Sequence, residues 1–312
     1  MIEPVPDTGF RWARPVSGDG FELVPGQENP KKLLIVRKQA ARFAFYSPLD
    51  EETGLFRILA DTAVTAEGCL AFANAYGSLY RGEHAEWQEP EEDIRPPVTD
   101  VAYWIKQVGE LRALIRLWDA AEAEDTAELS CLLQFGKGRP QVVGLPLPEY
   151  STPARLNAYH RVTYIWEHWY GNLDSAPPVK MLPEIARAYC GFVLHERFQG
   201  FLNYGLRWNK ALKTVESSFL PRNLYSAAFL QLSFAITGNK KYQKCPSCGR
   251  WFELLPGVNR ANRLTCGQAC RTRAYRLRRA RAIELAAQGK TAREIAKEVG
   301  SDVTKVKQWL TS

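Results

Sequence analysis

Four cysteines near the C-terminal end of the 312-residue chain have a spacing that suits metal chemistry. Two residues separate Cys245 from Cys248, three separate Cys266 from Cys270, and seventeen lie between the pairs. A two-residue gap lets a tight turn aim two sulfurs at one point, and Gly249 would let the chain leave that turn with a positive φ. Zinc takes four thiolate or imidazole ligands in tetrahedral geometry. The pattern therefore predicts one zinc ion bound by Cys245, Cys248, Cys266 and Cys270.

This zinc would be structural, because four protein thiolates leave no coordination position open for a substrate. We expect Cys266 and Cys270 on one face of the first turn of a helix, whose positive end favours thiolates. Trp251 and Phe252 would pack beneath the metal. The alternatives are four free thiols, or a redox pair at the first two cysteines. The other three cysteines are expected to be small buried hydrophobic residues; they are Cys69, Cys131 and Cys190.

A strongly basic helix is predicted directly after the last of the four ligands. Arginine makes bidentate contacts to phosphates and to guanine edges, and six arginines crowd this helix: Arg271, Arg273, Arg276, Arg278, Arg279 and Arg281. Residues 240–312 hold 17 Lys and Arg against 5 Asp and Glu, a formal charge of +12, whereas residues 1–239 hold 24 against 29, or −5. A basic tail on a mildly acidic body is typical of nucleic-acid-binding proteins. The alternative is that body carboxylates pair with these arginines.

Residues 245–281 resemble the zinc finger of the bacterial CGNR and ABATE-domain proteins, which are viewed as transcriptional regulators. A knuckle followed by a helix that supplies the second ligand pair describes a treble clef, and in that family too the finger follows a larger N-terminal domain. The resemblance implies the four ligand positions and a role in binding DNA. The sequence departs from the family after Cys270, where Arg271-Thr272-Arg273 stands in place of Gly-Asn-Arg.

Two short helices are predicted to follow the basic helix. Gly289 would end the basic helix, Thr291 and Glu294 form a capping box that starts the next helix, and Gly300 permits a sharp turn. Ser301 or Asp302 can cap the last helix. The residues expected to face inward, together with the rear of the basic helix, are Ile295, Ala296 and Val299, then Val303, Val306 and Leu310, with Trp309 alongside.

The run from 292 to 310 resembles a bacterial helix-turn-helix. That family has a small residue, a glycine and a β-branched residue where Ala296, Gly300 and Val306 stand, although Ser301 replaces the usual apolar residue after the turn. The resemblance implies that the last helix enters the major groove of DNA. The residues that would then face bases and phosphates are Asp302, Thr304, Lys305, Lys307 and Gln308. The alternative is a trihelical unit used for protein contacts or packing.

Residues 1–239 are predicted to form a mainly helical body, so the fold class is mainly α with a small β element (α+β). Residues 33–36 and 43–46 are expected to pair as strands of a β-hairpin near the start. Residues 137–148 would be a strand or connector, and residues 82–97 an acidic loop. Apolar periodicity predicts helices over 51–61, 65–76, 99–121, 153–170, 183–208 and 223–237. Two further domains would follow, a zinc finger over 240–288 and a helix-turn-helix-like tail over 289–312.

The body shows no familiar catalytic motif, such as HExxH, GxSxG or GxxxxGK, so we do not expect an enzyme. Its dense aromatic residues between 159 and 208 are expected in the core, with a small-molecule pocket as the alternative. The histidines are expected to be structural; they are His84, His160, His168 and His195. The N-terminus resembles no secretory signal, and the longest apolar stretch, 226–237, is too short to span a bilayer. A cytoplasmic, nucleoid-associated protein without membrane contact is expected.

Three hypotheses follow from these patterns. The leading one is a zinc-containing, DNA-binding transcriptional regulator whose body senses a small-molecule effector or forms a homodimer. The second is an RNA- or protein-binding adaptor, in which Tyr275 and Trp251 stack on unpaired bases. The third is an enzyme that acts on nucleic acid delivered by the basic tail.

Overall fold

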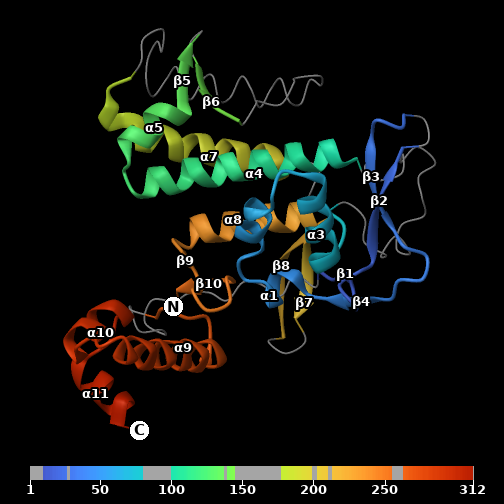
Figure 1. The fold of residues 1–312 in the computed structure, drawn as a ribbon. Coiled ribbons are helices and arrows are strands. Elements are labelled where there is room, and N and C mark those ends of the chain that lie inside the picture. Colours follow the sequence, from blue (N-terminus) through green and yellow to red (C-terminus); the bar gives the residue numbers. More distant parts are fainter. Residues whose placement is uncertain are drawn as a thin grey trace. The chain divides into compact units, whose positions relative to one another are not determined.

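The computed structural model describes residues 10–26, 29–79, 100–136, 139–144, 177–198, 202–209, 213–254 and 263–311, and it combines helices with small two-stranded sheets in an α+β fold (Figure 1). Internal contacts divide the chain into two units, residues 1–239 and 240–312. The predicted helix over 153–170 and acidic loop over 82–97 lie outside the described residues, as does part of the segment 137–148. None of the described helices is long and apolar enough to cross a membrane.

The first unit begins with one long β-hairpin that bends midway. Its strands are β1 (Trp12–Pro15), β2 (Phe21–Pro25), β3 (Leu33–Arg37) and β4 (Phe43–Tyr46). β1 pairs with β4 and β2 with β3, and the two antiparallel ladders share one register, since Trp12 lies opposite Tyr46 and Phe21 lies opposite Arg37. Gly18, with a φ of 70°, lies in the bend between the ladders.

The prediction that residues 33–36 and 43–46 pair with each other is wrong, although both segments are strands. They follow one another along the same arm of the hairpin, so each pairs with residues that precede Gly26. The chain only bends after β3, because the backbone N–H of Lys38 still donates to the carbonyl of Gly20 on the other arm, at 2.9 Å.

Helices make up most of the rest of the first unit. The described ones are α1 (Pro48–Glu51), α2 (Leu55–Asp61), α3 (Ala66–Tyr76), α4 (Val101–Glu122), α5 (Thr126–Leu132), α7 (Leu182–Phe198) and α8 (Leu224–Thr237), with the 3-10 turn η2 (Val179–Met181). Side-chain caps set the starts of α3, α4 and α8, because Thr65, Asp100 and Asn223 each accept a hydrogen bond from a backbone N–H of the first turn. These starts lie within two residues of those predicted from the sequence.

α4 supplies much of the core of the first unit. It packs against α2, α5 and α7, and Figure 1 shows α7 running alongside it. In the helix predicted over 99–121, Val108, Leu111, Leu114 and Leu117 are fully buried, and Trp104 joins them at 1% exposure. The three- and four-residue spacing of these side chains therefore places one face of α4 in the core.

The predicted helix over 183–208 is wrong in its second half. α7 ends at Phe198, and β7 (Leu202–Asn209) then pairs antiparallel with β8 (Thr214–Pro221); β5 (Leu133–Gly136) and β6 (Arg139–Val142) form a shorter pair. Apolar residues alternate along β7, and this two-residue period is typical of a strand. Tyr204 is 65% exposed and Trp208 is 56% exposed, which contradicts their predicted place in the core. Most of the other aromatics between 159 and 208 lie outside the described residues.

The second unit contains one β-hairpin and three helices in its described part. Its elements are β9 (Lys241–Lys244), β10 (Trp251–Leu254), α9 (Gln268–Ala287), α10 (Ala292–Val299) and α11 (Val303–Thr311). The three helices pack against one another in every pairing. Their shared core comprises Ala282, Leu285, Ile295, Ala296, Val306 and Trp309, all buried. Leu310, predicted to face inward, is 39% exposed, because Trp309 occupies the inner position of the last turn.

Caps and glycines fix the connections between these three helices as predicted. Gly289 has a φ of 81°, and its N–H and that of Lys290 donate to carbonyls of the last turn of α9. Thr291 and Glu294 bond reciprocally in a capping box at the start of α10. Gly300 ends α10 in the left-handed conformation, with a φ of 61°.

Candidate metal centre and basic helices

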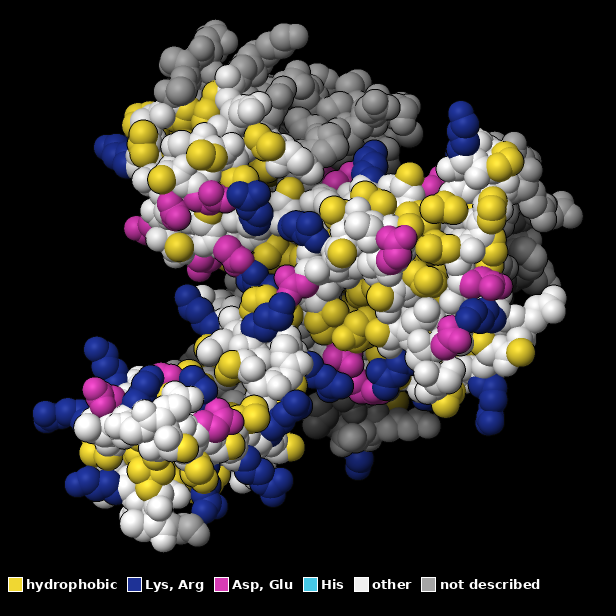
Figure 2. All heavy atoms as spheres, viewed as in Figure 1, with side chains coloured by type: hydrophobic (Ala, Val, Ile, Leu, Met, Phe, Trp, Pro, Cys, Tyr) yellow, Lys and Arg dark blue, Asp and Glu magenta, His cyan; other side chains and the backbone are white. Residues whose placement is uncertain are grey.

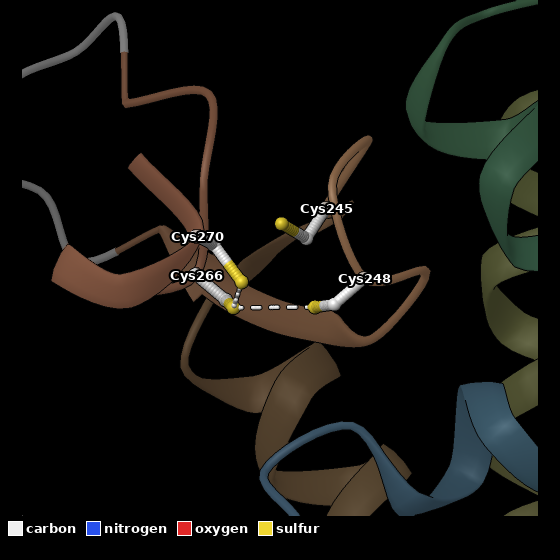
Figure 3. Close-up of side chains that lie close together, drawn as sticks. All are labelled: Cys245, Cys248, Cys266 and Cys270. Carbon is white, nitrogen blue, oxygen red and sulfur yellow. Dashed lines mark hydrogen bonds between the residues drawn. The ribbon is translucent and has the colours of Figure 1, made fainter. Parts of the chain in front are cut away.

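The β9–β10 turn brings the first pair of cysteines together. The N–H of Cys245 donates to the carbonyl of Arg250, and the N–H of Gly249 donates to the carbonyl of Cys245, both at 2.8 Å. Gly249 has a φ of 73°, as the spacing predicted. Because these bonds close a tight turn, the sulfurs of Cys245 and Cys248 point to the same side of it (Figure 3).

The second pair of cysteines stands at the start of α9. Cys270 lies in the first turn of the helix, whereas Cys266 lies just before the N-cap residue Gly267 and not within the helix as expected. The guanidinium of Arg263 holds this approach in place by donating to the backbone carbonyls of Thr265, at 2.9 Å, and Cys266. The helix start therefore presents two sulfurs toward the β9–β10 turn (Figure 3).

All four sulfurs lie within 4.8 Å of one another, so the four cysteines could hold a metal ion. The Sγ of Cys266 is 3.5 Å from that of Cys248 and 3.5 Å from that of Cys270. Metal–sulfur bonds of about 2.3 Å in a tetrahedron place sulfurs about 3.8 Å apart, whereas a disulfide bond is about 2.05 Å long. All seven cysteines of the chain are free thiols. The spacing thus fits a shared metal and excludes paired disulfides.

The electrostatic setting of the cluster also suits a cation. Burial would raise the pKa of Cys245, but backbone N–H groups of Cys266, Ser247 and Cys248 donate to its sulfur and lower the pKa to about 6. Burial and the neighbouring thiols raise the pKa of Cys266 to about 12. Sulfurs this close do not all become thiolates by themselves, because like charges repel. A divalent cation among them would remove that repulsion.

Aromatic side chains support the turn, in part as predicted. Phe252 is buried at 5% exposure and carries the guanidinium of Arg263 over its ring, at 5.2 Å. Trp251 is only half-buried, with the ammonium of Lys244 at 5.9 Å from its ring. Phe252 therefore joins the strand β10 to the segment that carries Cys266.

The six arginines predicted for nucleic-acid contact all lie on α9. Five of them are exposed and Arg279 is half-buried. Arg281 is ion-paired at 3.1 Å to both Glu284 and Glu298, and Lys290 also pairs with Glu298. Within the described part of the second unit, no carboxylate pairs with the other exposed members of the set; these are Arg271, Arg273, Arg276 and Arg278. Among the described residues of this unit, carboxylates therefore neutralise α9 toward its C-terminal end but not nearer the four cysteines.

The predicted contact residues of α11 lie together on its exposed side: Thr304, Lys305, Lys307 and Gln308. The carboxylate of Asp302 accepts the N–H of Thr304 at 2.7 Å, so Asp302 caps the helix, and this bond lowers its pKa. Figure 2 shows dark blue Lys and Arg side chains around much of the visible surface of the three helices, with few magenta acidic ones.

The body holds one polar cluster that the sequence did not single out. Glu110 on α4 is 3% exposed and pairs with Arg197 on α7. Burial raises the pKa of Glu110, although Arg197 and Lys106 act to lower it. The available signal was a carboxylate set among the buried apolar positions of a helix. Of the four histidines, only His195 lies in the described part of the chain, and it belongs to α7.

Among the remaining cysteines, Cys69 and Cys190 are buried as predicted, and Cys131 is exposed, contrary to prediction. Cys131 lies near the end of the short helix α5, whose inner side is formed by Leu129 and Leu132 instead.

No known protein family, curated protein or solved structure matches this chain.

Proposed function

We propose that this protein is a zinc-containing regulator of transcription that binds duplex DNA through its C-terminal unit. The observation that carries the proposal is the junction at the start of α9, where four convergent thiols adjoin a helix with exposed, unneutralised arginines. The metal clamps the β9–β10 turn to this helix, and the helix then carries its charge to a ligand.

Zinc is the proposed metal because it favours four thiolates in a tetrahedron, and its role here is structural. Iron is the other metal that four cysteines accept. Elemental analysis of protein purified under reducing conditions should give about one zinc per chain. Iron at that stoichiometry, or no metal in reduced protein, would overturn the assignment.

The fold proposed for the second unit is a treble clef followed by a helix-turn-helix. The β9–β10 turn and the start of α9 supply the ligands as in a treble clef, and α10, Gly300 and α11 follow as helix, turn and helix. Three features support this: the capping box at Thr291, the left-handed Gly300 and the small core shared with α9. In this arrangement α11 enters the major groove and α9 contacts phosphates.

Binding of the full-length protein to a mixed-sequence DNA duplex, measured against salt, tests the proposal. Each phosphate contact adds about 0.9 to the slope of log K against log salt. The double substitutions Arg271→Gln/Arg273→Gln and Lys305→Gln/Lys307→Gln should weaken binding and reduce the slope. A matched loss of charge in the first unit, Lys31→Gln/Lys32→Gln, should leave both unchanged. Equal effects of all three pairs, or no duplex binding at low salt, would contradict the proposal.

Single-stranded RNA is the second candidate ligand, because Tyr275 is 39% exposed beside the arginines and offers a surface for a base. In competition against a labelled duplex, single-stranded RNA should displace the protein only at higher concentration than unlabelled duplex. Preferential displacement by RNA would favour the adaptor hypothesis.

A further inference from the structure

The side of α9 that faces away from the helical core has no partner among the described residues of the second unit. At about 100° per residue, Ala280 and Ala287 lie opposite the buried Ala282 and Leu285. Leu277 and Ile283 flank this small-residue strip on its two sides, and they are 59% and 49% exposed. Two large apolar side chains on a helix that is otherwise strongly basic are the feature to be explained. Figure 2 shows yellow apolar atoms exposed among the dark blue side chains of the second unit.

This surface is complementary to itself. Arg276 lies four residues before Ala280, and Glu284 lies four residues after it, so each is about 6 Å from Ala280 along the helix axis. If two copies of α9 pack antiparallel with Ala280 at the crossing point, Arg276 of each copy lies level with Glu284 of the other. In the same arrangement Leu277 of each copy lies level with Ile283 of the other.

We propose that this face of α9 binds a second copy of the chain, through antiparallel packing about Ala280. A two-fold interface brings the same patch of both copies together, and opposite charges placed symmetrically about a small central residue meet that requirement. Parallel packing is disfavoured, because it would set Arg273 and Arg276 against their own counterparts. The sequence placed a possible homodimer in the body; the charge pattern of α9 favours the second unit instead.

The pairing is compatible with the contacts that the structure contains. Glu284 is exposed and bonds Arg281 at 3.1 Å through one oxygen, which leaves its other oxygen for Arg276 of the second copy. Arg271 and the exposed residues of α11 lie off this face, so the inference does not depend on nucleic-acid binding. A single pair of helices buries less than about 1,200 Å² in total, and interfaces of that size are weak. The dimer should therefore depend strongly on concentration.

Sedimentation of the full-length, metal-containing protein, freed of nucleic acid, tests this inference from micromolar to submillimolar concentration. We expect reversible dimerisation. Arg276→Glu and Glu284→Arg should each weaken it about tenfold or more, since each creates two like-charge pairs, and the double reversal should restore it. Arg276 and Glu284 of one copy are eight residues apart, so a contact within the chain would not produce that rescue.

A second pair of variants keeps the test independent of charge reversal. Ala280→Glu sets two carboxylates against each other at the two-fold axis and should abolish the dimer. Ala287→Glu places a carboxylate level with Arg273 of the other copy and should preserve or strengthen it. Both sites are exposed and helical, so circular dichroism should show folded proteins. A monomer at every concentration, a dimer insensitive to these changes, or failed rescue would overturn the proposal.

Discussion

Trp309, in the last turn of the chain's final helix, donates its indole N–H to the hydroxyl oxygen of Tyr275 on α9, at 2.8 Å. The two rings also meet edge to face, with centroids 5.4 Å apart. Trp309 is 4% exposed, whereas Tyr275 is 39% exposed. The pair therefore fastens α11 to the basic helix and orients an aromatic ring beside the arginines.

Removing this bond should loosen α11 without unfolding the first unit. Tyr275→Phe loses only the hydroxyl acceptor, so the local free energy of opening should fall by about 0.5–1.5 kcal/mol. Trp309→Phe loses the donor and also part of a buried ring, so it should cost more, and the double variant should cost less than the sum of the two. Hydrogen exchange of peptides from α11 would measure this. Fully additive costs would mean that the bond does not form in solution.

Replacing glycine by alanine should have opposite effects on stability at Gly300, which has a left-handed conformation, and at Gly191, which lies inside a helix. Gly300→Ala should destabilise the second unit by about 1–2 kcal/mol, because its φ of 61° is unfavourable for a residue with a Cβ atom. A Cβ at Gly191, within α7, meets nothing within 4 Å, so Gly191→Ala should stabilise the first unit by about 0.5–1 kcal/mol. Hydrogen exchange resolved by unit would show both effects. A stabilising Gly300→Ala would disprove the left-handed turn.

Local chemistry explains why the second unit was the more predictable one. Its turn glycines and its capping box act within a few residues and took the predicted form, and the four cysteines converge as predicted, although Cys266 lies just before α9. The error at Leu310 concerned which of two adjacent apolar residues faces inward. That choice depends on the contact of Trp309 with Tyr275, thirty-four residues away.

The wrong predictions in the first unit concern which strands pair with each other and whether apolar residues follow a helical or a strand period. Residues 33–36 and 43–46 were recognised as strands, but their partners depend on the hydrogen bond that Gly26 donates to Lys32 and on hydrogen bonds that continue through a bend. Residues 202–209 were assigned to the preceding helix because they contain several apolar side chains, but those side chains alternate with a two-residue period and the segment pairs with β8. The ion pair of Glu110 and Arg197 joins positions 87 residues apart, which no local pattern indicates.

Replacing only one partner of that buried ion pair should strongly destabilise the first unit. Glu110→Met leaves Arg197 partly buried without its carboxylate, and Arg197→Met leaves a buried carboxylate alone; each should cost about 3–5 kcal/mol. The double variant should cost less than either, since it leaves no uncompensated charge. Thermal unfolding followed by circular dichroism would report the differences. A double variant as unstable as the sum of the two would contradict a direct pairing.

The second unit should lose stability in mild acid. Hydrogen bonds from Thr291 lower the pKa of Glu294, and those from Lys290 and Arg281 lower that of Glu298. The pKa values of both carboxyl groups are lower in the folded state than in the unfolded state. Their contribution to the stability of the second unit is therefore present above about pH 4.3, the unfolded-state pKa, and is lost as the pH falls through the folded-state pKa values. Between pH 7 and pH 4, the amides of α10 should therefore lose less protection from hydrogen exchange in Glu298→Gln than in the wild-type protein. Wild-type and variant proteins are compared at each pH, because acid also releases a thiolate-bound metal. If α10 loses the same protection in both proteins, the Glu298 carboxylate does not contribute to the acid sensitivity of the second unit.

Removal of the proposed metal ion should affect the two units unequally. The β9–β10 turn and the start of α9 contact each other mainly through the four sulfurs and the Arg263–Phe252 contact, so a chelator should expose the amides of both segments. Those of α4 and α7, in the core of the first unit, should stay protected. Cys248→Ser should reproduce the effect of the chelator and lower the bound metal well below one per chain. Cys131→Ser is the matched control, since Cys131 is also exposed but lies outside the cluster, and it should leave both metal content and exchange unchanged. Equal metal content in the two variants would show that Cys248 is not a ligand.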